Sequence, residues 1–144
     1  MSEHELASLL LRPDEAGVYK VPDHDIDALA EAAAADGIPC VRIDLRDVAC
    51  KRDFLESLSS ALDFPAHVAR NWDALVDALG DLRRPATPGL VLLLQNTDRL
   101  RLESADDFQT GMEVLQSATA EWAERGRPCW VFVSLPDSEF RAVE

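Results

Sequence analysis

Two uninterrupted apolar runs constrain the fold of this chain more than any other feature. They span residues 89–95 (Gly-Leu-Val-Leu-Leu-Leu-Gln) and 129–134 (Cys-Trp-Val-Phe-Val-Ser). A strand of this composition has no polar face, so it must be covered on both sides, as strands of parallel sheets are. Both runs have the length of a strand and are far shorter than the roughly 18 apolar residues of a membrane-spanning helix. They predict two buried strands in a small parallel sheet with covering helices.

The rest of the chain alternates between extended and helical patterns. Residues 17–21 and 39–45 have the composition of strands, and residues 83–88, with two prolines, indicate a loop. Apolar residues recur at helical spacing in four segments: 26–35 after Asp25, 54–62 after Asp53, about 71–79, and a long stretch from Ser104 to Gly126. We expect Asp25 and Asp53 to be N-caps. The alternation predicts a single α/β domain built on a small, mostly parallel sheet of three or four strands with helices packed on it.

The charge balance narrows the range of partners. The chain of 144 residues contains 27 acidic and 14 basic residues, which gives a formal net charge of −13. Such a surface repels nucleic acid and anionic membranes and attracts basic proteins, although acidic composition also serves solubility alone. The N-terminus shows no basic segment ahead of an apolar one, so we expect a cytoplasmic location.

Motifs of known catalytic or metal-binding chemistry are missing from the sequence. Cys40, Cys50 and Cys129 form no C-x-x-C pair, and the three histidines fall in unrelated segments. Phosphate-binding and nucleophile motifs rich in glycine are absent as well. We therefore expect neither a metal, nor a cofactor, nor enzymatic activity, and we expect Cys40 and Cys129 to be buried thiols within strands.

The segment around residues 71–81 is the strongest candidate for a functional surface. Trp72, Leu75 and Leu79 share one helix face, which predicts that Trp72 packs in the core. Asp73 and Asp77 lie four residues apart on another face, and no Lys or Arg at the next helical position offsets them. Three interpretations are open: a solvated face of an acidic protein, a binding patch, or a catalytic carboxylate pair. The last is the weakest, because an exposed pair lacks the burial that creates a general acid.

This segment resembles the barstar family, whose members are intracellular ribonuclease inhibitors. The order of elements from residue 39 to 134 is also similar, so the resemblance covers a core of about residues 39–135. It leaves residues 1–38 as an N-terminal extension, with a possible extra strand and helix, and 136–144 as a tail. The matching residues are Asn71, Asp73, Ala74, Leu75, Asp77 and Leu79, in the family pattern Asn-x-Asp-Ala-Leu-x-Asp-x-Leu.

The resemblance implies a site and a function. In that family the equivalent helix plugs a ribonuclease active site, with Asp77 matching the most deeply inserted carboxylate and Asp73 the one a turn earlier. Glu121 matches a third acidic contact, and Asn71 is expected to cap the helix. His67 and Val76 replace aromatic residues of the family, and Arg70 replaces an acidic one. The implied partner-binding set is Asp73, Asp77, His67, Arg70, Val76, Asp81 and Glu121.

The expectation that follows is an inhibitor or immunity protein, monomeric when free, that blocks a basic bacterial ribonuclease or nuclease toxin. The altered aromatic residues and the N-terminal extension support an alternative: an adaptor or regulatory module of the same fold for a basic protein that is not a nuclease.

Overall fold

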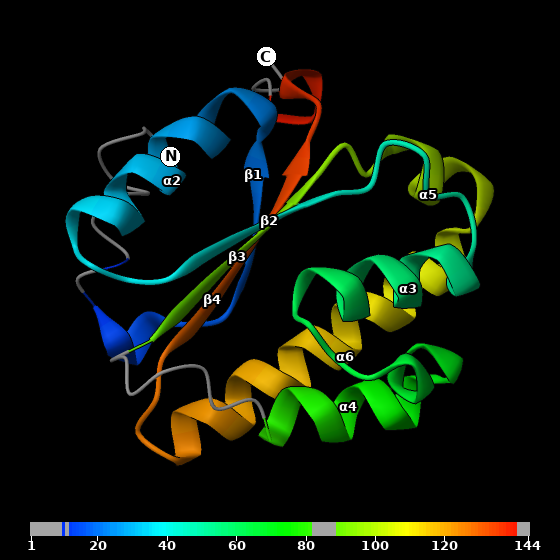
Figure 1. Cartoon of the computed structure of the whole chain (residues 1–144). Helices are drawn as coiled ribbons and strands as arrows, with labels where there is room; N and C mark the ends of the chain where they lie inside the picture. Colours follow the sequence, from blue (N-terminus) through cyan, green and yellow to red (C-terminus); the bar gives the residue numbers. More distant parts are fainter. Residues whose placement is uncertain (1–9, 11, 82–88, 141–144) are drawn as a thin grey trace.

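A four-stranded parallel sheet forms the centre of the molecule (Figure 1). The computed structural model describes residues 10, 12–81 and 89–140. The strands are β1 (Val18–Pro22), β2 (Cys40–Asp44), β3 (Leu90–Gln95) and β4 (Cys129–Leu135), in the spatial order β1-β4-β3-β2. All three neighbouring pairs are parallel. The two apolar runs form buried strands, as predicted, and the structure places them at the centre of the sheet as β3 and β4.

Helices cover both faces of the sheet, which gives three layers. Helix α2 (Ile26–Ala35) lies on one side, and α3 (Lys51–Ala61), α4 (Trp72–Asp81) and α6 (Ala105–Glu124) lie on the other (Figure 1). A short helix, α5 (Asp98–Glu103), joins β3 to α6. Single 3-10 turns occur at η1 (Pro13–Glu15), η2 (Asp23–Asp25), η3 (Ala66–Arg70) and η4 (Asp137–Phe140). The predicted α/β class with a small parallel sheet is confirmed.

Two apolar clusters, one on each side of the sheet, explain why β3 has no polar face. Leu92 and Leu94 belong to the larger cluster, beneath α3, α4 and α6. Val91 and Leu93 point the other way, into the smaller cluster beneath α2. Burial of both faces removes every one of these side chains from water, and this is the main stabilising contribution to such a sheet. The continuous apolar pattern follows from this double coverage.

Helix starts differ in detail from the sequence-based expectations. Asp53 was expected to be an N-cap and is not: α3 begins at Lys51, and the capping position is taken by Cys50, whose backbone is extended. Asp53 lies in the first turn instead, where its charge favours the positive end of the helix dipole. Asp25 does occupy the N-cap position of α2, but its side chain makes no capping hydrogen bond. The predicted loop at 83–88 lies outside the described residues.

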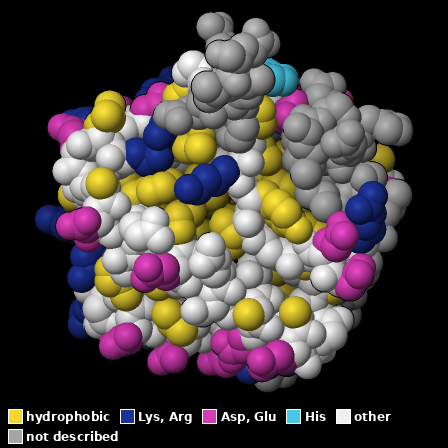
Figure 2. Space-filling model, turned by 180° about the vertical axis from the view of Figure 1, so that it is seen from behind, with side chains coloured by type: hydrophobic (Ala, Val, Ile, Leu, Met, Phe, Trp, Pro, Cys, Tyr) yellow, Lys and Arg dark blue, Asp and Glu magenta, His cyan; other side chains and the backbone are white. Residues whose placement is uncertain are grey.

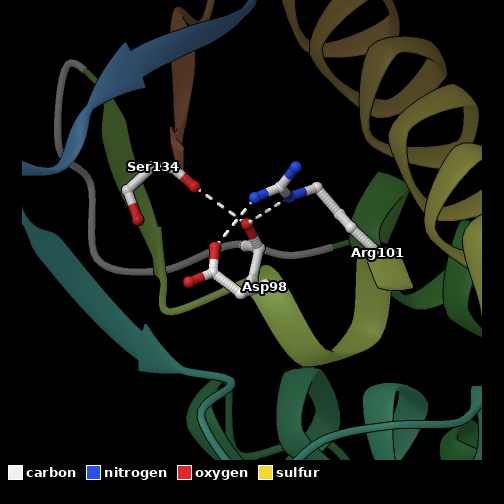
Figure 3. A network of polar contacts seen from close by, with 4 residues as sticks. Asp98, Arg101 and Ser134 are labelled. Carbon is white, nitrogen blue, oxygen red and sulfur yellow. Dashed lines mark hydrogen bonds and ion pairs between the residues drawn. The ribbon is translucent and has the colours of Figure 1, made fainter. Parts of the chain in front are cut away.

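Polar contacts join the carboxyl ends of the central strands (Figure 3). The buried Thr97 hydroxyl donates a hydrogen bond of 2.8 Å to the carbonyl oxygen of Ser134, so it links the segment after β3 to β4. Arg101 donates to the Thr97 hydroxyl oxygen at 3.2 Å and pairs with Asp98 at 2.8 Å. These contacts fix the first turn of α5 to the carboxyl ends of the central strands.

The three cysteines have different environments, and all are free thiols. Cys129 is buried in β4, and this burial raises the pKa of its thiol to about 12. Cys40 is partly buried and its pKa is also raised by burial, whereas Cys50 is exposed. Cys50 is therefore the most exposed of the three thiols. None of the helices in the described part of the chain combines the length and apolar character that a membrane span requires.

Candidate protein-binding site

Helix α4 presents two carboxylates on one exposed stripe. Asp73 and Asp77 lie one turn apart, and both are exposed. Among the described residues, no hydrogen bond or ion pair engages either side chain. Asp81, the last residue of α4, is exposed too. The stripe therefore offers unpaired negative charge to an approaching molecule.

The N-terminus of α4 is capped by its neighbour in the sequence. Asn71 has an extended backbone, and its side-chain oxygen accepts a hydrogen bond of 2.8 Å from the backbone N–H of Ala74. This is the geometry of an N-cap, which satisfies one of the free N–H groups at the start of a helix. The cap fixes the first turn, in which Asp73 lies.

The C-terminus of α4 is held by side chains from α6. The indole N–H of Trp122 donates a hydrogen bond of 2.9 Å to the carbonyl oxygen of Leu79, and Arg125 donates one to the carbonyl oxygen of Gly80. These two bonds satisfy carbonyl groups that have no partner within their own helix. Because both ends are fixed, α4 forms a rigid support for its acidic stripe.

Glu121 lies beside the last turn of α4. A side chain added at Gly80 would have its Cβ 2.9 Å from a carboxylate oxygen of Glu121, so the glycine makes room for this close approach. The same carboxylate pairs with Arg125 at 2.9 Å. The structure thus brings Glu121 to the end of the acidic stripe, with its charge partly neutralised.

The remaining candidate residues have different surroundings. His67 and Arg70 are exposed on η3, just ahead of α4, whereas Val76 is half-buried and packs against the larger apolar cluster. Trp72 also packs against that cluster, as expected, with its ring 5.8 Å from the ring of Phe54 in an edge-on arrangement. His67 and Arg70 are therefore the members of this group that are accessible to a partner.

A hollow of about 550 Å³ between α3 and η3 adds residues that the sequence did not point to. We call it the cationic hollow, because Lys51 and Arg52 from α3 line it together with Arg70 from η3. Its other lining residues are Leu55, Glu56, Ala66 and Ala69. One signal for it was present in the sequence: two consecutive cations at the start of a helix, where the helix dipole favours acidic residues.

Metal chemistry has no support at this face. Within residues 12–81 and 89–140, no group of three or more His, Cys, Asp or Glu side chains is placed to hold a metal ion. Asp73 and Asp77 point to solvent from α4, so what they offer a partner is charge and hydrogen-bond acceptors.

The fold is similar to that of a much longer protein. Two solved structures of the Aeropyrum pernix ORC2 protein, in an ADP form and in ADPNP-ADP complexes, match 95% and 94% of this chain with TM-scores of 0.60 and 0.56. Sequence identity is 14% and 16%, so the likeness shows the fold alone. The chain spans about two fifths of those chains, 41% in each case. No curated protein matches the sequence.

The prediction of a ribonuclease inhibitor or antitoxin is wrong by this comparison. Two structures that share the fold over 95% and 94% of the chain are ORC2 proteins, and neither is described as a ribonuclease inhibitor. Lys51, Arg52 and Arg70 line the cationic hollow between α3 and η3, so the surface ahead of α4 is not uniformly acidic.

A family model supplies the remaining comparison. The model described as "Barstar (barnase inhibitor)" matches residues 38–134, which is about two thirds of the chain. The matched range runs from just before β2 into β4 and includes α3, η3, α4 and α6. It therefore contains the acidic stripe and its supports, whereas β1 and α2 precede it. On this match, the chain belongs to the barstar family.

Proposed function

We propose that this chain is a protein-binding module without catalytic activity, which docks through α4 onto a basic surface of a partner other than a ribonuclease. The observation that carries the proposal is the pair of exposed carboxylates, Asp73 and Asp77, which have no partner among the described residues and lie on a helix fixed at both ends. Charge-assisted hydrogen bonds from Arg or Lys to carboxylates are about twice as strong as neutral ones. A rigid helix makes such bonds without first losing conformational entropy.

The overall charge supports the same choice of partner. A net charge of −13 accelerates encounters with a basic protein and opposes binding to nucleic acid or to an anionic membrane. It also opposes self-association, so we propose a monomer when the partner is absent. The three free thiols are typical of a reducing compartment, which supports a role in the cytoplasm.

Nucleotide binding is not part of the proposal, although the two ORC2 titles name ADP and ADPNP. In doubly wound sheets a nucleotide phosphate sits on a glycine-rich turn after the first strand, at the N-terminus of the next helix. Here the turn after β1 is Asp23-His24-Asp25, which contains no glycine and carries two carboxylates. These carboxylates would repel a phosphate.

The test compares two pairs of neutralising substitutions. Acidic side chains are spread widely over the surface: on the face shown in Figure 2 they lie around the margin and gather along the lower edge. The control must therefore remove the same amount of charge elsewhere. D73N/D77N removes the stripe, and D106N/E113Q removes two exposed charges from α6.

Each variant is immobilised, used to capture proteins from an extract of the source cell, and then titrated with the captured protein. We expect D73N/D77N to weaken binding at least about tenfold, the effect of removing buried charge pairs from an interface. The control should bind like the unsubstituted chain, and high salt should weaken both. Equal capture by the unsubstituted chain and D73N/D77N would contradict the proposal.

A further inference from the structure

The cationic hollow reverses the sign of charge that dominates the chain. Acidic residues outnumber basic ones 27 to 14 overall, yet three of the seven residues that line the hollow are Lys or Arg and only one is acidic. Two of them, Lys51 and Arg52, stand in the first turn of α3, where the helix dipole disfavours cations. The helix dipole therefore does not explain their placement.

The cations differ in how far they are already neutralised. Arg52 pairs with Glu56 at 3.2 Å. Lys51 lies 6.0 Å from the centre of the Trp72 ring, and no carboxylate pairs with it in the described part of the chain. Arg70 is exposed, and no hydrogen bond or ion pair engages it among the described residues. About two positive charges are left over, which matches one or two carboxylates from outside.

The remaining lining residues of the hollow are mostly apolar: Leu55, Ala66 and Ala69. A volume of about 550 Å³ is within the range of small-ligand sites, so the hollow has room for a few side chains of a peptide. A hollow lined by apolar and cationic side chains fits Asp or Glu side chains with apolar neighbours better than it fits a bare polyphosphate.

The hollow adjoins the acidic stripe. Arg70 lies three residues before Asp73, which limits the distance between their Cα atoms to about 11 Å. A molecule that covers the first turn of α4 therefore also reaches the rim of the hollow. The two surfaces carry opposite charge, so together they admit a partner in only one orientation.

We propose that the cationic hollow receives an acidic segment, with one or two Asp or Glu side chains beside apolar ones, from the protein that docks on α4. Because this inference rests on the proposed function, it adds one requirement to the partner: basic residues facing α4 and acidic residues facing η3. A second copy of this chain is a poor occupant, since two molecules of charge −13 repel each other.

The direct test uses a defined peptide and the whole chain. An acetylated, amidated Leu-Glu-Leu-Asp-Leu peptide is titrated into the isotope-labelled protein, and backbone NMR shifts are followed. We expect shifts confined to residues 51–56 and 66–70, and no binding of the Leu-Gln-Leu-Asn-Leu counterpart. K51Q/R70Q should weaken binding at least about tenfold, as expected when charged partners are removed. K20Q/R46Q, which removes one exposed Lys and one exposed Arg outside the hollow, should not.

Peptide binding separates this inference from the proposed function. D73N/D77N should bind the acidic peptide at least as tightly as the unsubstituted chain, because it removes nearby negative charge. If the natural partner is lost with D73N/D77N while the peptide fails to bind, or binds K51Q/R70Q equally well, the inference is overturned and the proposed function stands. The opposite outcome is that the peptide binds at the hollow while D73N/D77N captures the partner normally. It would support acidic-segment binding by the hollow and contradict the role of α4 in the proposed function.

Discussion

At Gly111, α6 crosses α3 so closely that a side chain does not fit. A Cβ atom at this position would collide with Cε2 of Phe54 and lie 2.8 Å from its Cζ. Phe54 is fully buried, so a shift of its ring would displace other core side chains. Alanine is favoured over glycine in a helix by about 1 kcal/mol, whereas overpacking a core costs about 1–3 kcal/mol. Because the shift would disturb a close-packed core, we expect overpacking to dominate.

The substitution G111A is therefore expected to lower the free energy of unfolding by up to about 2 kcal/mol, the overpacking cost reduced by the gain in helix propensity. The measurement is urea denaturation followed by circular dichroism. S117A, on an exposed position of the same helix, serves as the control and should be neutral or slightly stabilising. An unfolding midpoint of G111A equal to or above that of the unsubstituted chain would show that α6 and α3 are packed less tightly than described.

At the level of single elements, the cap of α4 gives the sharpest prediction. N71A removes the oxygen that accepts the Ala74 N–H, and loss of such a cap costs about 1 kcal/mol. Asn71→Ser keeps an acceptor and should retain most of the stability. Both are measured by thermal and urea unfolding. If N71A and N71S both have the same unfolding midpoint as the unsubstituted chain, the Asn71 side chain does not hold the start of the helix.

Sequence pattern predicted most elements because their signals are local. The bounds of α2 were predicted to the residue, and β3 and β4 to within one, since helical spacing and apolar runs are properties of short segments. Helix α5 was missed because six residues give too short a periodic pattern. The cap of α3 was misplaced because an aspartate is equally suited to the N-cap and to the first turn.

The site was predictable only in part, and the reason is distance along the chain. Asp73, Asp77 and Asn71 belong to one helix and its cap, so spacing alone placed them together. The cationic hollow requires η3 to fold back on α3, and no local pattern encodes that contact. The bonds from Trp122 and Arg125 to α4 join residues more than 40 positions apart, so they too emerge only from the fold.

At the scale of the whole molecule, His24 joins the two ends of the described chain. Its ring lies 3.1 Å from the buried Asp25 at the start of α2 and 3.0 Å from Asp137, beyond β4. The hydrogen bond with His24 holds the pKa of the Asp137 carboxyl below its usual 3.8. A carboxyl with a lowered pKa in the folded state stabilises that state above its usual pKa, and this contribution is lost as the pH falls through the lowered value.

We therefore expect D137N to be less stable than the unsubstituted chain at about pH 5, which is above the lowered pKa of the Asp137 carboxyl. The difference should shrink below the usual pKa of 3.8 and vanish once Asp137 is protonated in both states. Unfolding by urea at several pH values measures it, and H24Q should show at least as large a loss at pH 5. If the stability difference between D137N and the unsubstituted chain stays constant over the whole pH range, the lowered pKa of Asp137 does not contribute to stability.

The strand order also has a consequence for the timing of folding during synthesis. Of the four strands of this sheet, β1 leaves the ribosome first and pairs with β4, which leaves last. Loop closure over such a distance comes late, after the local contacts have formed. The Val21 side chain and part of the apolar face of α2 thus lack their cover until β4 has been made. The segment ahead of β2 is the one most exposed to aggregation or chaperone capture in the nascent protein.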